Sequence, residues 1–299
     1  EPWDGPASIL FSDGDIMGAV LDRNGLRPSR YYVTNDGYLI LSSEVGVLPV
    51  DESRIKLKDR LRPGKMLLVD TVKGELIDDD ELKEKYATKQ PYGEWLDNNL
   101  VQLHDLKIPN KKVPVHTKEE RARLQKAFGY TYEDFKTSIL PMALNGSEQI
   151  GAMGIDTPLA VLSDDHQPLF NYFKQLFAQV TNPPIDSIRE KVVTSTTVYL
   201  GSDGNVLEEK PENCKQLRIN NPILTNTDIL KIKNMKVDGF KVETIPIIYY
   251  KNTSLEKAID HLYVEADRAH REGANIIILS DRGVDENHVA IPSLLAVSA

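Results

Sequence analysis

The sequence predicts a protein of mixed α/β and α+β class, in which antiparallel hairpins come first and an α/β domain with βαβ units and a partly parallel sheet follows. Two observations carry this prediction. Residues 1–77 alternate short apolar runs with glycine turns, which is typical of hairpins. Residues 245–279 instead hold an apolar run, an amphipathic helical stretch and a second apolar run. Since 299 residues exceed what one core usually organises, we expect two domains, residues 1–105 and residues 106–299.

Three hairpins are predicted in the first domain. Each consists of two short runs on either side of a dipeptide that ends in glycine, the residue that most readily adopts the positive φ of a tight turn. The paired runs are residues 7–11 with 16–21, residues 31–33 with 38–42, and residues 66–72 with 75–77.

A charged, helix-favouring stretch follows at residues 78–123. Pro109 and Pro114 interrupt it, because proline cannot continue a helix, and we place the domain boundary in this region. Thr131 then predicts the start of another helix, since Asp134 stands at the third position and can complete a capping pair. This helix is expected to end at Asn145-Gly146, after which the second domain begins to alternate strands with helices.

In the second domain, residues 159–162 predict a short buried strand, and residues 169–180 predict a helix that stops before two prolines. The last unit has the clearest pattern. An apolar strand at residues 245–250 precedes a helix that Ser254 caps and Gly273 ends, and residues 276–279 form the next strand.

This strand–helix–strand arrangement predicts a parallel βαβ unit. In barrels and open sheets of this kind, ligands bind beyond the carboxyl ends of the strands. Residues 251–252 and 280–282 are therefore candidate ligand positions.

Composition excludes several classes of protein. With 40% hydrophobic and 27% charged residues the chain is typical of a globular protein, and no apolar run is long enough to span a bilayer. A formal charge of -9 opposes binding to nucleic acid. Cys214 is the single cysteine, so an internal disulfide framework or a multi-cysteine metal or cluster site is excluded, and a cytoplasmic location is expected.

Several possible sites have simpler interpretations. Residues 145–153 hold two glycines at phosphate-loop spacing, but Ala152 and Met153 replace the Lys and Ser or Thr that such a loop needs, so we interpret the segment as a helix-ending turn. His261 and Glu265 lie four residues apart without a third ligand, which favours a solvated helix face. Cys214 itself, in a polar loop, is interpreted as an unreactive thiol.

Residues 22–28, with the sequence DRNGLRP, combine a glycine turn with two arginines that could grip a carboxylate. A purely structural turn is the alternative from the residues alone. This segment and residues 42–47, with the sequence SSEVGV, resemble paired motifs of class II glutamine amidotransferases. The opening EPWDGPA at residues 1–7 is similar to the glutaminase domain of glutamate synthases. Residues 169–190 and 280–295 resemble the central domain of the same family, so the likeness covers essentially the whole chain.

That family forms glutamate from glutamine and 2-oxoglutarate with reducing electrons, using an N-terminal cysteine to hydrolyse glutamine and an internal tunnel to carry ammonia. The resemblance implies that this chain is a fragment: the C-terminal part of the αββα amidotransferase sandwich plus a truncated central domain. Because residue 1 is Glu and Cys214 is internal, we expect no catalytic residue within it and no activity of the fragment alone.

The resemblance also implies two supporting sites and no metal site. One group is expected to lie behind the glutaminase pocket, and a second to line the ammonia tunnel. The first group is Asn24, Gly25, Arg27, Ser43 and Glu44, and the second is Thr181 and Asn182.

No cofactor is expected within this chain. FMN and an iron-sulfur cluster are expected to bind downstream of Ala299. Expected partners are the FMN-binding synthase domain, upstream glutaminase residues, and a small electron-supplying subunit or ferredoxin, with neither nucleic acid nor membrane. The alternative is a stand-alone α/β module that binds an anionic metabolite without catalysis.

Overall fold

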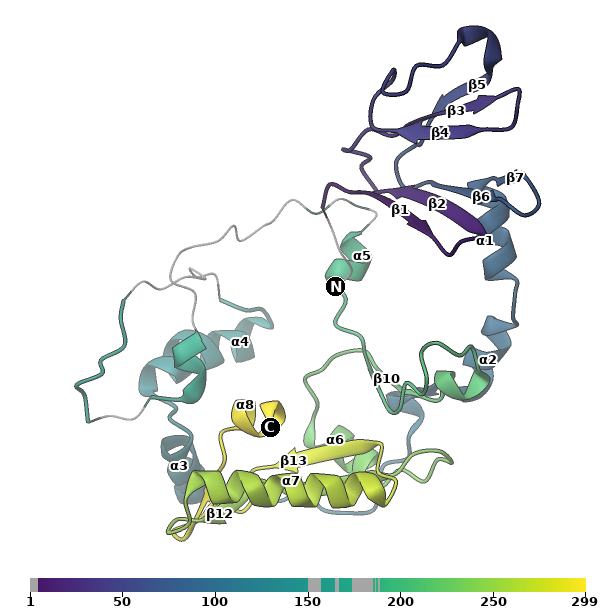
Figure 1. Cartoon of the computed structure of the whole chain (residues 1–299). Coiled ribbons are helices and arrows are strands. Elements are labelled where there is room, and N and C mark those ends of the chain that lie inside the picture. Colours follow the sequence, from purple (N-terminus) through teal and green to yellow (C-terminus); the bar gives the residue numbers. More distant parts are fainter. Residues whose placement is uncertain (1–4, 150–156, 165–166, 174–184, 186, 188) are drawn as a thin grey trace. The chain divides into compact units, whose positions relative to one another are not determined.

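The computed structural model describes residues 5–149, 157–164, 167–173, 185, 187 and 189–299 (Figure 1). It divides into two compact units, unit 1 (Glu1–Glu94) and unit 2 (Trp95–Ala299). The expected fold class is confirmed, since unit 1 carries antiparallel sheets and unit 2 combines helices with parallel and antiparallel strand pairs. The functional boundary between residues 105 and 106 stays a prediction.

Unit 1 contains two antiparallel sheets, and they confirm the three predicted hairpins. The first sheet has the order β1-β2-β6-β7, with β1 (Ser8–Ser12), β2 (Ile16–Leu21), β6 (Met66–Asp70) and β7 (Glu75–Ile77). The second has the order β4-β3-β5, with β4 (Leu39–Ser42), β3 (Arg30–Thr34) and β5 (Ile55–Arg60). Strand β5 was not predicted, because its exposed, charged sequence IKLKDR lacks the apolar face that identifies a strand.

The core of unit 1 joins its two sheets. Buried side chains of β2 and β6 pack with Tyr31 of β3 and with Leu61. A smaller cluster forms where Leu82 of helix α1 (Asp79–Ala87) covers Leu68 and Ile77. The alternation of apolar and polar residues in the hairpins therefore gives each sheet one apolar face, which packs in the core, as is typical of half-buried antiparallel sheets.

Unit 2 is built from short elements around two apolar clusters. Its helical segments are α2 (Tyr92–Asn99), which begins in unit 1, η2 (Leu103–Asp105), α3 (Lys118–Ala127), the π-helical η3 (Asp134–Ile139), α4 (Leu140–Asn145), η4 (Leu169–Phe173), α5 (Glu190–Val193), η5 (Pro211–Cys214), α6 (Asn226–Lys233), α7 (Leu255–Arg271) and α8 (Ser293–Ser298). Its strands are β8 (Val101–Gln102), β9 (Val198–Leu200), β10 (Leu217–Ile219), β11 (Val242–Pro246), β12 (Ile248–Tyr250), β13 (Ile276–Ser280) and β14 (His288–Ala290).

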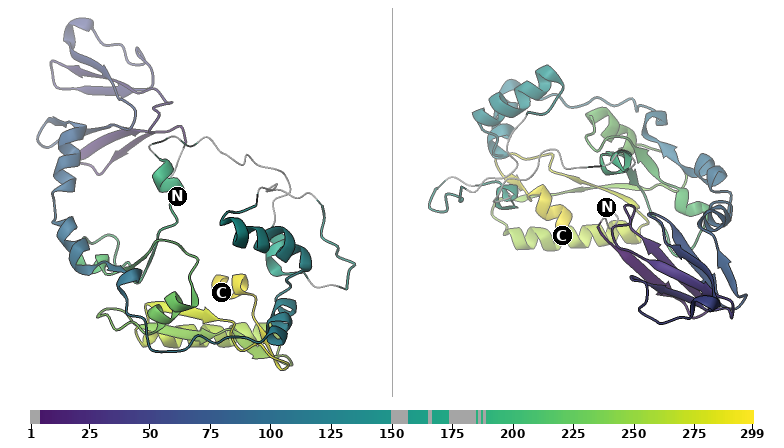
Figure 2. Two further views of the ribbon diagram at one scale, coloured as in Figure 1. Left: turned by 180° about the vertical axis from the view of Figure 1, so that it is seen from behind. Right: turned by 90° about the horizontal axis from the view of Figure 1, so that it is seen from above.

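The predicted βαβ unit is confirmed: β11 and β13 pair in parallel, and α7 connects them. Figure 2 shows α7 lying along this strand pair. Ala258, Leu262 and Ala269 of this helix are buried in the core. Ser254 caps α7 by accepting a hydrogen bond from the Lys257 N–H, and Gly273 follows its end with a φ of 89°.

One predicted strand is in fact two. Residues 245–250 divide between β11 and β12, which pair with different partners, β13 and β14. The change occurs after Pro246, which has no N–H to extend the ladder. Ile247 then donates to the Ser280 carbonyl and accepts from the Ile291 N–H, so the chain passes from one sheet to the other.

Two predictions in the middle of unit 2 have different outcomes. The capping pair is confirmed, since the Asp134 carboxylate accepts from the Thr131 N–H at 2.7 Å, and the helical run ends at Asn145 with Gly146 at a φ of 64°. The prediction of a strand at residues 159–162 is wrong, since Leu162 is 97% exposed and lies in a turn. So short an apolar run forms a strand only where a neighbouring strand pairs with it, and none among the described residues does so here. Within the helix expected at residues 169–180, the described part is the 3-10 segment η4, and the rest lies outside the described residues.

The start of helix α6 provides a local stability test. Thr225 and Asp228 form a reciprocal capping box, with the Asp228 N–H donating to Thr225 Oγ at 3.1 Å. We expect Thr225→Ala to lower the free energy of unfolding by about 1 kcal/mol, because the Asp228 N–H at the helix end loses its acceptor. Urea denaturation followed by circular dichroism measures this loss. Thr227→Ala, on the same helix but outside the cap, is the matched control, and an equal loss there would contradict the explanation.

Candidate functional site

The turn at residues 22–28 is organised by Asp22. One carboxylate oxygen accepts from the Ala7 N–H at 3.2 Å, and the other accepts from the N–H groups of Asn24 at 3.1 Å and Leu26 at 3.5 Å. The Asp22 carbonyl accepts from the N–H groups of Gly25 at 2.9 Å and Gly64 at 3.1 Å. Desolvation raises the pKa of Asp22, but these backbone hydrogen bonds outweigh it and leave the pKa below its usual value. Asp22 is therefore held ionised at the centre of the turn.

The sheet brings the two motif segments to one end. Arg30 at the start of β3 pairs with Ser42 at the end of β4. Because the strands are antiparallel, the turn that precedes β3 and residues 43–44, which follow β4, leave the sheet at the same end. The Ser42 hydroxyl donates to the Glu44 carbonyl at 2.5 Å and shapes the second segment.

The side chains predicted to support the pocket differ in exposure. Asn24, Arg27, Ser43 and Glu44 are exposed, whereas Gly25 is half-buried. Gly25 has a φ of 58°, and a Cβ atom placed there would lie 2.6 Å from Cγ of Pro63. This position therefore requires glycine both for its backbone conformation and for its contact. Thr181 and Asn182 lie outside the described residues, so their place in the tunnel wall stays a prediction.

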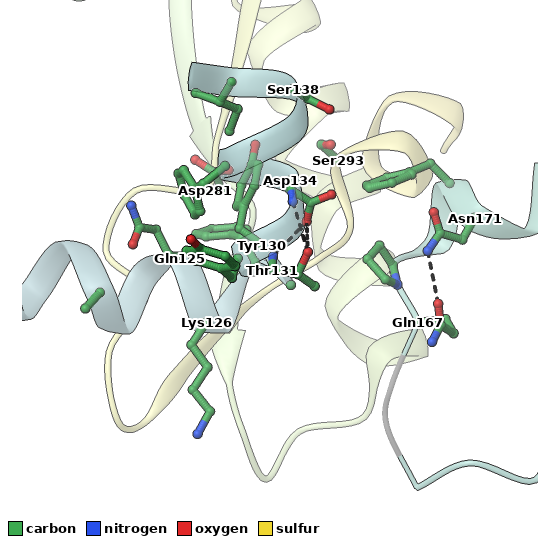
Figure 3. Close-up of a pocket in the computed structure, with 18 residues that line it drawn as sticks. Gln125, Lys126, Tyr130, Thr131, Asp134, Ser138, Gln167, Asn171, Asp281 and Ser293 are labelled. Carbon is green, nitrogen blue, oxygen red and sulfur yellow. Dashed lines mark hydrogen bonds between the residues drawn. The ribbon is translucent and has the colours of Figure 1, made fainter. Parts of the chain in front are cut away.

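A cavity of about 1090 Å³ opens in unit 2 and includes one predicted ligand position (Figure 3). Asp281, just beyond the carboxyl end of β13, lines it together with Tyr130, Thr131 and Ser293. Residues 251–252 do not line it; the Lys251 ammonium donates to the Glu286 carbonyl at 3.0 Å in the connection between β13 and β14. Residues 128–132, FGYTY, also line the cavity and were not predicted as site residues, although an aromatic run before a capped helix is a signal visible in the sequence.

The electrostatics of this cavity are unfavourable for an anion. Asp281 and Asp134 both line it, and Figure 3 shows the Lys126 side chain extending away from the other labelled groups. Hydrogen bonds from the backbone and hydroxyl of Thr131 hold the pKa of Asp134 below its usual value, so this carboxylate is charged and committed to capping. The alternative of an anionic metabolite at the ends of the βαβ strands receives no support from this geometry.

Other candidate residues take structural positions. Glu265 binds Arg268 at 2.9 Å rather than turning toward His261, and within the part of the chain that the structure describes there is no group of three or more His, Cys, Asp or Glu side chains suited to a metal ion. Cys214 is half-buried at the end of η5. Across the described residues no helix combines the length and apolarity needed to cross a membrane.

Comparison with known families agrees with the division into two units. Residues 1–95 match the model for class II glutamine amidotransferases, and residues 123–299 match the model for the glutamate synthase central domain. The chain belongs to the glutamate synthase family. This confirms the resemblance that the motifs indicated and extends it beyond them.

Glutamate synthases that are named for different electron donors match the whole length of this chain. The NADPH glutamate synthase large chain of Bacillus subtilis is 46% identical over 100% of this chain and 19% of the relative's length. The NADH enzyme of Schizosaccharomyces pombe is 43% identical over 100% of this chain and 15% of its own, and ferredoxin-dependent glutamate synthase 2 of Synechocystis is 43% identical over 100% and 19%. The chain therefore spans about a fifth, or less, of the length of these curated relatives.

Proposed function

We propose that this chain serves the glutamate synthase reaction, in which nitrogen released from glutamine is added to 2-oxoglutarate and reducing electrons complete the formation of glutamate. The observation that carries the proposal is similarity along the entire chain to glutamate synthases named for NADPH, NADH and ferredoxin. The same observation favours this function over a stand-alone metabolite-binding module, because both units match parts of one family.

In unit 1, the proposed role is to support the glutaminase pocket from behind. Asp22 holds the turn through hydrogen bonds on both its carboxylate and its carbonyl, and the antiparallel pairing of β3 and β4 fixes the second segment beside the same sheet end. Such a support acts by position rather than by reaction, since a rigid second layer keeps reacting groups in place. The residues assigned to it are Asn24, Gly25, Arg27, Ser43 and Glu44.

In unit 2, Thr181 and Asn182 are proposed to line the ammonia tunnel, on the strength of the sequence resemblance. The two prolines that follow, Pro183 and Pro184, would restrict the backbone conformations available to the segment that forms this tunnel wall. The proposed partners are the FMN-binding synthase domain and further glutaminase residues, together with a small electron-supplying subunit or ferredoxin. The proposed compartment is the cytoplasm.

FMN and an iron-sulfur cluster are the cofactors that the family implies. The residues present do not fit the cluster, because protein-bound clusters are held by several cysteine thiolates and this chain has Cys214 alone. We therefore assign the cluster to residues that follow position 299 in the longer relatives, and on the family resemblance we assign FMN to the same part of the protein. No chemical step within residues 1–299 depends on either cofactor.

The test is an ammonia assay on the polypeptide of residues 1–299. We expect no release of ammonia from glutamine above the blank, because an N-terminal nucleophile needs a cysteine whose own α-amino group acts as the base, and Cys214 is an internal residue. The positive control is a longer protein in which an N-terminal cysteine and the rest of the glutaminase domain precede these residues. Turnover by residues 1–299 alone would overturn the assigned role.

A further inference from the structure

Arg218 is a half-buried cation whose Nε atom has, within the described part of the chain, no partner that explains its place in the fold. It lies in the middle of β10, between Leu217 at 0% and Ile219 at 3% exposure, which both belong to the core that includes Ile232. Since side chains alternate along a strand, Arg218 is on the opposite face of this small sheet. Its Nε is buried, and among the described residues it has no hydrogen-bond partner. A buried polar atom in this condition is costly and calls for an explanation.

Arg218 lines a cavity of about 230 Å³ at one edge of the sheet. Strands β8 and β10 are parallel, with Arg218 opposite Gln102, so the segments that follow them leave the sheet at the same edge. These segments contribute polar side chains to the lining, and helix α6 contributes two charged ones. Besides Arg218, the lining consists of Leu103, His104, Ile219, Asn220, Asn221, Ile223, Leu224, Asp228 and Lys231.

The charge in this cavity is positive although the whole chain is acidic. Lys231 supplies a second cation beside Arg218. The one lining carboxylate, Asp228, accepts from the N–H of Thr225 at 3.1 Å and from its hydroxyl at 2.6 Å, so it is engaged at the helix cap. His104 lies 3.3 Å from its neighbour Asp105 and adds positive charge only when protonated. The described lining of the cavity therefore holds two cations, Arg218 and Lys231, and one carboxylate, which is already engaged in hydrogen bonds at the helix cap.

We propose that this cavity binds a small organic anion whose carboxylate is carried on a short aliphatic stem. The planar guanidinium of Arg218 offers paired donors to a carboxylate, and the Lys231 ammonium adds a second charge. The amides of Asn220 and Asn221 supply further polar contacts, and neighbouring Leu and Ile side chains cover the stem. The volume limits the ligand to a small metabolite. This site in unit 2 is separate from the turn at residues 22–28 and does not depend on the proposed glutaminase role.

Titration calorimetry of the whole chain with glutarate tests the proposal, with inorganic phosphate as the second probe. We expect glutarate to bind more tightly than phosphate, because phosphate has no aliphatic stem. Arg218→Gln should weaken glutarate binding by at least about tenfold. The glutarate affinity of Arg218→Lys should lie between those of the unsubstituted chain and Arg218→Gln, because lysine keeps the charge and loses the paired donors. Lys233→Gln, on the same helix as Lys231 but outside the cavity lining, should bind like the unsubstituted chain.

A thermal measurement keeps the test independent of the calorimetry. Without glutarate, Arg218→Met should raise the Tm by about 2–4 °C, because it removes a buried donor that has no partner. Glutarate should raise the Tm of the unsubstituted chain and leave that of Arg218→Met unchanged. Should Arg218→Gln fail to fold, Lys231→Gln provides the binding comparison. Three results would each overturn the proposal: no glutarate binding, tighter binding of phosphate, or equal glutarate binding in the Arg218 or Lys231 variants and the unsubstituted chain.

Discussion

Replacement of Gly25 by alanine is expected to lower the free energy of unfolding of unit 1 by about 2–5 kcal/mol. About 1–2 kcal/mol comes from the left-handed backbone, since Gly25 has a φ of 58°. A further 1–3 kcal/mol, roughly, comes from the new Cβ atom, which would lie 2.6 Å from Cγ and 3.1 Å from Cα of Pro63. Because one of these contacts is to a backbone atom, a side-chain rotation cannot relieve it. Urea denaturation followed by circular dichroism measures the change.

Gly74→Ala is the matched control for this experiment. Gly74 has a similar φ of 69°, but no atom lies within 4 Å of the position that its Cβ would occupy. We therefore expect a loss of about 1–2 kcal/mol there, from the backbone alone. Equal losses at the two positions would show that the Pro63 contact relaxes freely. In a whole glutamate synthase, the same Gly25 variant should also lower glutaminase activity if the turn supports the pocket.

Replacement of Asp79 by asparagine is expected to destabilise unit 1 by about 2–3 kcal/mol at neutral pH. Asp79 is 5% exposed at the start of α1, and its carboxylate accepts from the Met66 N–H at 2.9 Å. The same carboxylate lies 2.8 Å from the Lys65 ammonium and 2.7 Å from that of Lys83. Asparagine keeps the shape but removes the charge that all three donors share. Asp80→Asn is the control, because Asp80 also binds Lys65 at 2.8 Å but is 82% exposed, and surface pairs contribute little.

The contribution of Asp79 should disappear in acid. Desolvation raises the pKa of Asp79, but hydrogen bonds from Lys65, Lys83 and Met66 outweigh it and hold the pKa far below its usual value. Since an unfolded Asp has a pKa of about 3.9, the stabilisation is complete above that pH and is lost as the pH falls toward the lower folded-state value. The difference in unfolding free energy between the unsubstituted chain and Asp79→Asn should therefore shrink between pH 7 and pH 3. A difference that stays constant would contradict this explanation.

Local sequence patterns were reliable where neighbouring residues decide the structure. The three glycine turns of unit 1, the capping pair of Thr131 and Asp134, and the cap of Ser254 all depend on residues within a few positions of one another. The strand at residues 159–162 was wrong because four apolar residues do not specify a partner. Strand β5 was missed for the opposite reason, since its pairing with β3 overrides a sequence that looks like a charged loop.

The candidate site was less accessible to sequence analysis. Asn24, Gly25, Arg27, Ser43 and Glu44 came from a family resemblance, and no sequence pattern indicated that Asp22 would organise the turn. That role depends on the N–H groups of Ala7 and Gly64, which are distant along the chain and meet Asp22 only in the folded unit.

By itself, the sequence determined the family, the hairpins, the βαβ unit and the single cysteine that excludes a cysteine-bound cluster within residues 1–299. Only the tertiary structure decided that residues 245–250 divide between two sheets, that Pro63 leaves no room for a Cβ atom at Gly25, and that the Nε atom of Arg218 is buried without a partner among the described residues, in the cavity that Lys231 also lines. The physical reason is the same in each case. Turns and caps form between near neighbours, whereas strand partners, close contacts and buried charges depend on residues that come together only when the chain folds.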